Sequence, residues 1–178
     1  MALFARVRQV RDNGASQAGA TASSTRTVKK SLAAHMVINY YLNDHFWIME
    51  IKLQRQIVTT NAPAAIGPYS QAVEIGGLLF VSGQIPFNPA SGKLEHADIK
   101  GQARQSLENV KAIVEAAGLT LANVVKVNIS LTDMNAFADV NAIYAEYFTG
   151  EIKPARAVVQ VAALPKQVLI EIEAIAHR

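Results

Sequence analysis

Two segments near the C-terminus are the most informative part of this sequence: Lys153-Pro154-Ala155-Arg156-Ala157-Val158-Val159-Gln160-Val161 and Val168-Leu169-Ile170-Glu171-Ile172-Glu173-Ala174-Ile175-Ala176. Both alternate along part of their length, as β-strands with one buried face do. In strand geometry Arg156 shares a face with Val158 and Gln160, and Glu171 shares a face with Glu173. If the two strands pair, a guanidinium and a carboxylate can face the same space. Arg can hold a carboxylate through two hydrogen bonds and Glu can transfer a proton, so this pair suits a small acid.

The same spacing also fits a solvated hairpin that carries a surface ion pair. Exposed Arg and Glu are common on strands, and such pairs contribute little to stability. Spacing alone favours this second interpretation, so the choice depends on the rest of the chain.

The composition predicts one ordinary domain and a tail. The chain has 178 residues, of which 51% are hydrophobic and 17% are charged, enough apolar material to bury a core. It contains no cysteine, which excludes a disulfide framework, a thiolate nucleophile and any Cys-based metal or cluster site. The four histidines show no metal-ligand spacing, and the sequence has no glycine-rich phosphate-binding motif.

The positive charge belongs to the tail. Of the 17 bases and 14 acids in the chain, residues 1–48 hold six bases and two acids, which leaves 11 bases and 12 acids from Met49 onward. The main domain is therefore nearly neutral. A surface that follows a nucleic-acid backbone is disfavoured.

Residues 1–34 are rich in Ala, Ser, Thr and Gly without a sustained apolar period, so we expect them to be disordered. Residues 36–51 are more apolar, but polar residues interrupt them well short of a membrane-spanning helix, and no membrane partner is expected. We interpret residues 1–48 as a leader or an upstream start added to a domain that begins at Met49. A transit peptide and a working arm are the alternatives. We expect a cytoplasmic protein, with organelle targeting as the second choice.

From Met49 the pattern is that of a compact α+β domain, residues 49–178. Strands are expected at 56–60, 70–75, 78–82, 124–131, 153–161 and 168–176, and helices at about 97–117 and 134–148. Gly76-Gly77 between two β-prone runs predicts a hairpin. The order βββαβαββ predicts a mixed six-stranded sheet with two helices.

One expected strand predicts an oligomer. Leu78-Leu79-Phe80-Val81 is apolar on both faces, so this strand needs cover on both sides. Two helices of the expected length can cover one face of a six-stranded sheet, hardly both. A partner subunit is the economical cover for the other face.

Two loops present side chains suited to a ligand. Gly67-Pro68 fixes a turn that delivers Tyr69 to the start of a strand, and Gly83 after Ser82 lets a ligand approach the backbone closely. Each also has a structural interpretation, Tyr69 as a packing anchor and Ser82-Gly83 as a β-bulge.

Six segments between about Gln56 and Arg178 form one ordered pattern: Asn61-Ala62-Pro63-Ala64-Ala65-Ile66-Gly67-Pro68-Tyr69-Ser70-Gln71, Ser82-Gly83-Gln84-Ile85-Pro86, Gln102-Ala103-Arg104-Gln105-Ser106-Leu107-Glu108-Asn109-Val110-Lys111-Ala112-Ile113, Pro154-Ala155-Arg156, Leu164-Pro165 and Ile170-Glu171-Ile172-Glu173-Ala174-Ile175-Ala176. This pattern resembles the reactive intermediate deaminases, the RidA (YjgF) family. Residues 1–48 lie outside it.

The resemblance implies a chorismate-mutase-like α+β fold with both helices on one face, and a homotrimer. It also implies clefts between subunits that hydrolyse 2-imino acids, such as 2-iminobutanoate and 2-iminopropanoate, to 2-oxo acids and ammonia without a cofactor or a metal. Arg156 would bind the substrate carboxylate and Glu171 would position or activate water. The remaining cleft positions implied are Tyr69, Ser82, Gly83 and Asn128, while Glu173 keeps a supporting or interface role.

One position departs from the family pattern. Many bacterial members have a Cys two residues after the motif Arg, where Val158 stands here. Hydrolysis does not need a thiol, so the expected activity stands. Two other functions stay open for this fold: a module that binds a small acid, and a stress-related protein-binding trimer with little turnover. RNA cleavage is disfavoured because the domain is nearly neutral.

Overall fold

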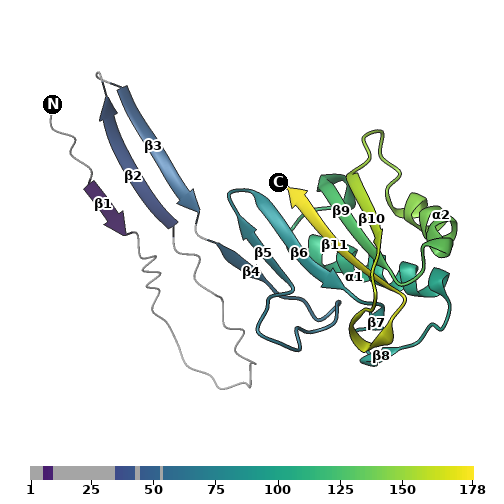
Figure 1. Ribbon diagram of the computed structural model, residues 1–178. Helices are drawn as coiled ribbons and strands as arrows, with labels where there is room; N and C mark the ends of the chain where they lie inside the picture. Colours follow the sequence, from purple (N-terminus) through teal and green to yellow (C-terminus); the bar gives the residue numbers. More distant parts are fainter. Residues whose placement is uncertain (1–5, 10–34, 43–44, 53) are drawn as a thin grey trace, which may run out of the picture. The chain divides into compact units, whose positions relative to one another are not determined.

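The computed structural model describes residues 6–9, 35–42, 45–52 and 54–178 (Figure 1). The chain divides into two compact units, Met1–Leu53 and Gln54–Arg178. In the first, β1 (Arg6–Gln9), β2 (His35–Leu42) and β3 (His45–Lys52) form an antiparallel sheet in that order. Arg6–Gln9, within the segment expected to be disordered, form β1. Their backbone pairs with residues 36–39, a partner that local composition does not reveal; the rest of 1–34 lies outside the described residues.

The second unit is a mixed sheet with two helices. Its strands are β4 (Arg55–Ile57), β5 (Ala72–Ile75), β6 (Leu78–Gln84), β9 (Val124–Leu131), β10 (Ala155–Gln160) and β11 (Ile170–His177), in the order β10-β9-β11-β6-β5-β4. Neighbouring strands are antiparallel except β9 and β10, which are parallel. The expected α+β fold with a mixed six-stranded sheet is confirmed.

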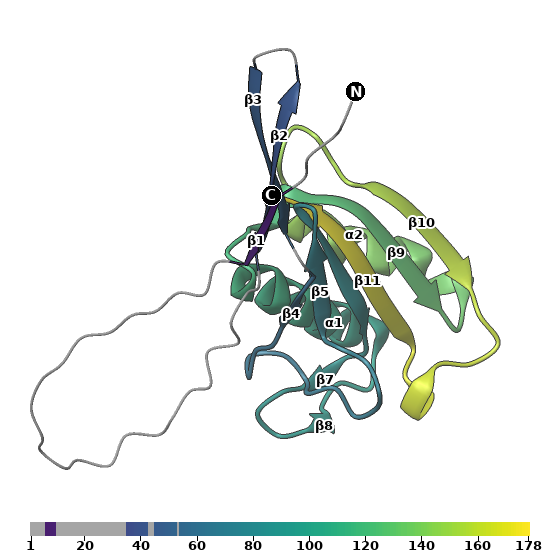
Figure 2. The same ribbon diagram turned by 90° about the vertical axis from the view of Figure 1, so that its left-hand side faces the viewer.

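Both helices lie on one side of this sheet (Figure 2). They are α1 (Ile99–Ala116) and α2 (Phe137–Tyr147), which follows the short 3-10 turn η2 (Met134–Ala136). Asp98 caps α1 by accepting a 3.0 Å hydrogen bond from the backbone N–H of Gly101.

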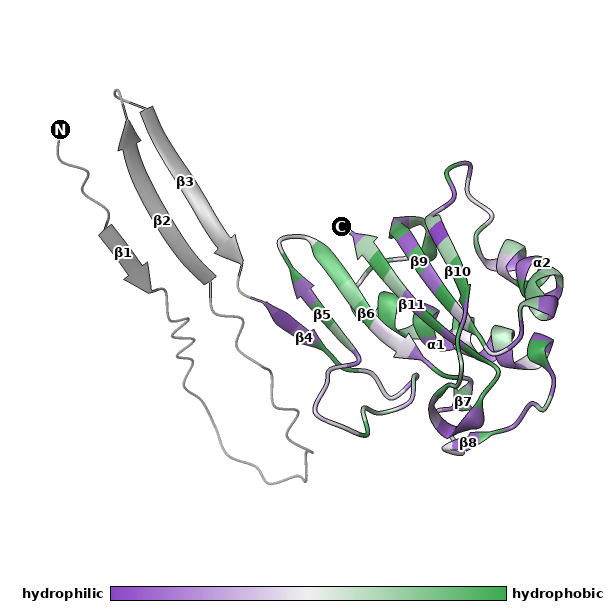
Figure 3. Ribbon diagram, in the orientation of Figure 1, coloured by the Kyte–Doolittle hydropathy of each residue, from purple (hydrophilic) through white to green (hydrophobic). Residues whose placement is uncertain are grey.

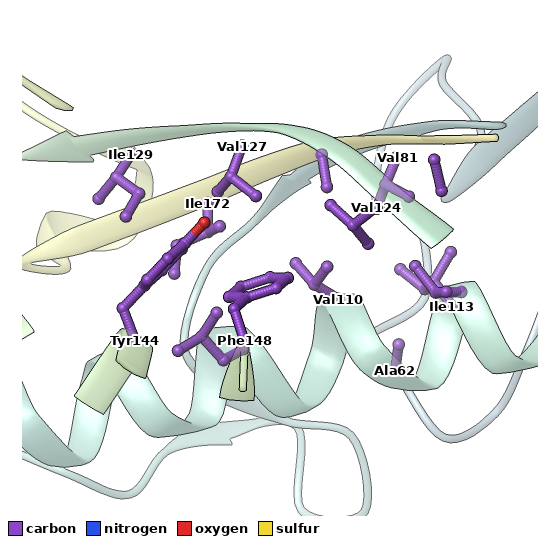
Figure 4. Packing of buried hydrophobic residues seen from close by; sticks show 14 of the residues in the cluster. Ala62, Val81, Val110, Ile113, Val124, Val127, Ile129, Tyr144, Phe148 and Ile172 are labelled. Atoms are coloured by element: carbon purple, nitrogen blue, oxygen red, sulfur yellow. The ribbon is translucent and has the colours of Figure 1, made fainter. Parts of the chain in front are cut away.

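The core fills the space between helices and sheet. In Figure 4, Tyr144 and Phe148 reach from α2 and its end toward Val127 and Ile129 of β9. Val127 and Ile129 are at most 1% exposed. Burial of each such side chain contributes about 1.5–3 kcal/mol.

The hairpin predicted from Gly76-Gly77 joins β5 and β6. Both glycines adopt the left-handed backbone that a tight hairpin needs, with φ of 57° and 81°. β4 is shorter than expected and ends at Ile57. The chain then turns into a loop held by Gln71, whose side-chain amide donates to the carbonyls of Ala62 and Pro63. A small hairpin, β7 (Phe87–Asn88) and β8 (Lys93–Leu94), was not expected from the sequence.

The pairing considered for the two C-terminal strands is wrong, because β9 lies between β10 and β11. The connection through α2 returns the chain parallel to β9 and places β10 at the sheet edge. β11 pairs antiparallel with the other side of β9 and with β6. This arrangement separates Arg156 from Glu171.

The sheet face away from the helices, called the open face below, is not covered by any element of the Gln54–Arg178 unit. Leu79 and Val81 of β6 are buried, whereas Phe80 between them is 43% exposed. In register beside Phe80 are Val73 of β5 and Ile175 of β11. Figure 3 shows that β6 is hydrophobic along most of its length. Residues 54–178 by themselves therefore leave apolar surface exposed where the sequence predicted cover on both sides.

Candidate active site

Glu171 lies on the open face. It is the second residue of β11, and Ile170 and Ile172 on either side of it are fully buried against the helix side. Alternation along the strand therefore turns Glu171 the other way. In register it stands beside Ser130 of β9, and its side chain is half-buried.

Gly83 makes room for the Glu171 carboxylate. A Cβ atom at position 83 would come within 1.8 Å of Oε1 and 2.7 Å of Cδ of Glu171. The register between β6 and β11 also shifts at this point, where Gln84 pairs with Ile172 and Val81 with Ala174. The β-bulge, which was the structural interpretation of Ser82-Gly83, is therefore present, and it admits a carboxylate from the same chain.

A cavity of about 420 Å³ opens beside Gly83. Tyr69 contributes to its wall, and the Tyr69 hydroxyl, on a side chain that is 48% exposed, accepts a long hydrogen bond of 3.4 Å from the backbone N–H of Ile66. Lys166 is the one charged side chain among the residues lining the cavity, and it adopts a left-handed backbone (φ 57°). The cavity walls are otherwise mostly apolar, so they suit a small ligand with few polar groups.

Ser82 fixes the loop that carries Tyr69. Its hydroxyl donates to the carbonyl of Ser70 at 2.7 Å, and its backbone N–H donates to the carbonyl of Gln71 at 3.0 Å. Because the hydroxyl proton is engaged, Ser82 can only accept a further hydrogen bond from a ligand. Asn128 also lies on the open face, half-buried in β9 and in register with Glu173.

Arg156 lies on the opposite side of the sheet. In register it stands beside Val127, which is fully buried under the helices. Its guanidinium carbon lies 4.4 Å from the ring centroid of Tyr144, and Nη2 donates to Oδ1 of Asn141 at 2.8 Å. Both partners belong to α2.

One chain thus assembles part of the predicted site. Gly83 adjoins the Glu171 carboxylate and follows Ser82 in β6, and Tyr69 lines the same cavity as Gly83. Arg156 is not among them, since it faces the helices. The two charged residues that motivated the site cannot act on one ligand within a single sheet face.

Sequence reasoning missed the partners of Arg156 on α2. Steps of four and three residues place Phe137, Asn141 and Tyr144 on one helix face. A polar residue inside an aromatic stripe was the available signal.

The environment of Glu171 favours its protonated form. Burial raises the pKa of the Glu171 carboxyl above its ordinary value, and the nearby negative charge of Glu173 raises it further. A carboxyl with a raised pKa suits general acid–base chemistry, because it can both accept and return a proton.

Two kinds of feature are absent from the described part of the chain. No group of three or more His, Cys, Asp or Glu side chains there could hold a metal ion. No helix there is long and apolar enough to cross a membrane.

Comparison with known proteins identifies the family. Residues 59–178 match the family model described as endoribonuclease L-PSP. A 2-iminobutanoate/2-iminopropanoate deaminase from Escherichia coli K12 is 56% identical over 128 residues, which cover 71% of this chain and 99% of that protein. The chain belongs to the RidA (YjgF) family.

Other relatives match over a similar share of this chain. A RutC family protein from Pyrococcus horikoshii is 58% identical over 126 residues, 71% of this chain and 99% of that protein. The crystal structure of the E. coli YjgF gene product matches with a TM-score of 0.67 and 56% identity, over 70% of this chain and 98% of that one. E. coli TdcF, solved with bound serine, matches with a TM-score of 0.67 and 51% identity over the same shares.

Glu173→Gln should lower the pKa of Glu171, because it removes the neighbouring negative charge and keeps the side chain's shape. The shift can be followed by NMR titration of the side-chain carboxyl carbons. Glu115→Gln, an exposed position on α1, is the control and should leave Glu171 unchanged. An unaltered Glu171 titration in Glu173→Gln would contradict the assigned electrostatic contact.

Gly83→Ala should fold but displace the Glu171 carboxylate. The atom that the new Cβ meets is the far end of a flexible side chain, and Gly83 does not need a left-handed backbone. A crystal structure should show another Glu171 rotamer, and the pKa of the more solvated carboxyl should fall. An unmoved carboxylate would show that Gly83 does not create its space.

Proposed function

We propose that this RidA-family protein hydrolyses reactive 2-imino acids, such as 2-iminobutanoate and 2-iminopropanoate, to 2-oxo acids and ammonia. The observation that carries the proposal is the half-buried Glu171 carboxylate over Gly83, beside a cavity lined by Tyr69. The E. coli deaminase at 56% identity supports the same reaction.

The chemistry needs few groups. The iminium carbon is already electrophilic, so attack requires a positioned water and a proton acceptor. Glu171 takes a proton from water as the oxygen adds to C2 of the imino acid. The same carboxyl then returns that proton to the amino group of the carbinolamine, so that the C2–N bond breaks and ammonia leaves. The carboxylate regenerated at Glu171 accepts the remaining hydroxyl proton as the C2–O bond becomes a carbonyl, and this proton passes to the ammonia to give ammonium. The raised pKa of Glu171 suits both steps.

The substrate carboxylate requires a cation, and we assign this role to Arg156 of a neighbouring copy. Arg156 lies on edge strand β10 and faces the helix side, whereas Glu171 faces the open side. A homotrimer in which each open face is covered by other copies would join the two residues in clefts between subunits. It would also bury the apolar surface around Phe80. Serine bound to E. coli TdcF supports recognition of an amino-acid-like carboxylate on this fold.

Two other functions would use the same surfaces. A binding module would capture a small acid without turnover, and a stress-related trimer would bind proteins. RNA cleavage, suggested by the description of the family model, is disfavoured because 12 acids balance 11 bases from Met49 onward. The presence of a carboxyl with a raised pKa favours the enzyme, since simple capture of an anion would not need it.

A coupled assay tests the activity directly. Threonine dehydratase generates 2-iminobutanoate, and release of 2-oxobutanoate is followed with and without this protein. We expect acceleration in proportion to the added protein. Binding of 2-oxobutanoate without acceleration would favour the small-acid module instead.

Arg156→Ala and Arg156→Lys should each lower kcat/KM by about a hundredfold, because a two-pronged charged contact contributes about 3 kcal/mol and Lys lacks the planar fork. Arg104→Ala is the matched control. Arg104 forms an exposed ion pair with Glu146 between the helices, so its loss should leave kcat/KM within about twofold. Wild-type turnover in both Arg156 variants would remove the proposed carboxylate anchor.

Phe80→Glu should prevent assembly, because it places a charge at the centre of the exposed apolar face. Light scattering should give the mass of a single chain, circular dichroism should stay close to wild type, and imine hydrolysis should be lost. Ala116→Glu makes the same charge change at the exposed end of α1 and should assemble normally. A monomeric, active wild-type protein at micromolar concentration would overturn the proposed assembly.

A further inference from the structure

The Arg156 side chain has a dedicated support on α2. Phe137, Asn141 and Tyr144 lie on one face of this helix and surround the guanidinium. Its carbon is 4.4 Å from the Tyr144 ring centroid and 5.7 Å from that of Phe137, and Nη2 donates to Asn141 Oδ1 at 2.8 Å. We propose that Asn141, together with these two rings, positions Arg156 to receive the substrate carboxylate. This inference rests on the anchor role proposed for Arg156.

The geometry of the support leaves Arg156 able to bind an anion. The guanidinium carbon lies over the rings of Tyr144 and Phe137, and the N–H groups of a guanidinium point outward in its own plane. Asn141 takes one of five N–H donors. The remaining N–H groups of the guanidinium are available to a substrate carboxylate, which binds in the plane of the guanidinium.

Such a support raises the affinity for substrate because it reduces the conformational entropy that the Arg156 side chain loses on binding. An Arg side chain on an edge strand has several rotatable bonds, and a ligand that must fix them loses affinity. Contacts that hold the guanidinium before the substrate arrives remove this loss. The Tyr144 side chain is held rigidly, because it is packed in the core and only 7% exposed. Burial also raises the pKa of the Tyr144 hydroxyl, so the ring stays neutral beside Arg156.

The absence of charge on the Asn141 side chain matters for substrate binding as much as its hydrogen bond does. Within residues 54–178, no Asp or Glu forms a salt bridge with Arg156. A carboxylate at position 141 would hold the guanidinium more tightly than the amide does. It would also neutralise the charge that attracts the substrate, so a structural role and a positioning role predict opposite outcomes for Asn141→Asp.

The test compares Asn141→Ala and Asn141→Asp in the full chain. Asn141 is exposed, so both variants should fold and assemble. Asn141→Ala should raise KM about five- to tenfold with kcat within about twofold. Asn141→Asp should raise KM more than Asn141→Ala while leaving the melting temperature unchanged or higher. Asn135→Ala and Asn135→Asp, at an exposed position in η2, are the matched controls and should keep the wild-type KM.

Binding of 2-oxobutanoate, measured by calorimetry, separates this inference from the proposed function. If the protein binds this acid without hydrolysing imines, the affinities should still fall in the order wild type, Asn141→Ala, Asn141→Asp. If Arg156→Ala abolishes binding while both Asn141 variants behave as wild type, the positioning role is wrong and the anchor role stands. Wild-type KM and affinity in Asn141→Asp would by themselves overturn the inference.

Discussion

Side-chain alternation across β9 is the constraint on which the site depends. β10 and β11 lie on either side of this strand, and register with Val127 turns Arg156 toward the helices while register with Ser130 turns Glu171 away from them. In this structure the two charges lie on opposite faces of the same sheet. We propose that the reaction draws them from different copies, so the proposed activity and the proposed assembly are one hypothesis.

The two faces of the sheet serve different purposes. The helix face holds the core and, at its edge, the contacts of Arg156 with Asn141 and Tyr144. The open face combines apolar side chains around Phe80 with the carboxyl of Glu171, whose pKa is raised by burial and by Glu173. Cover by a neighbouring copy would bury the apolar part and would exclude water from the carboxyl. In this proposal the same surface would serve both association and chemistry.

Local sequence patterns predicted most of the elements. The hairpin at Gly76-Gly77, both helices and the strand at 124–131 follow from turn chemistry and periodicity, which act over a few residues. The position of β9 between β10 and β11 did not follow, because it depends on which distant edges pair. The sequence predicted that Gly83 allows a group to approach the backbone closely, and it assigned that space to a ligand. That the approaching group is a carboxylate of the same chain required the bulge in β6. Asn141 was missed because a single polar residue in an aromatic stripe gives a weak signal.

Subunit complementation tests the central claim most directly. Arg156→Ala and Glu171→Gln chains, each expected to keep at most about a hundredth of the wild-type activity alone, are unfolded together in equal amounts and refolded, and mixed assembly is verified by native mass spectrometry. If each site takes Arg156 from one copy and Glu171 from another, random assembly restores one site in four, about a quarter of the wild-type activity. Mixed assemblies no more active than the parent variants would contradict the account, because both residues would then have to act from the same chain.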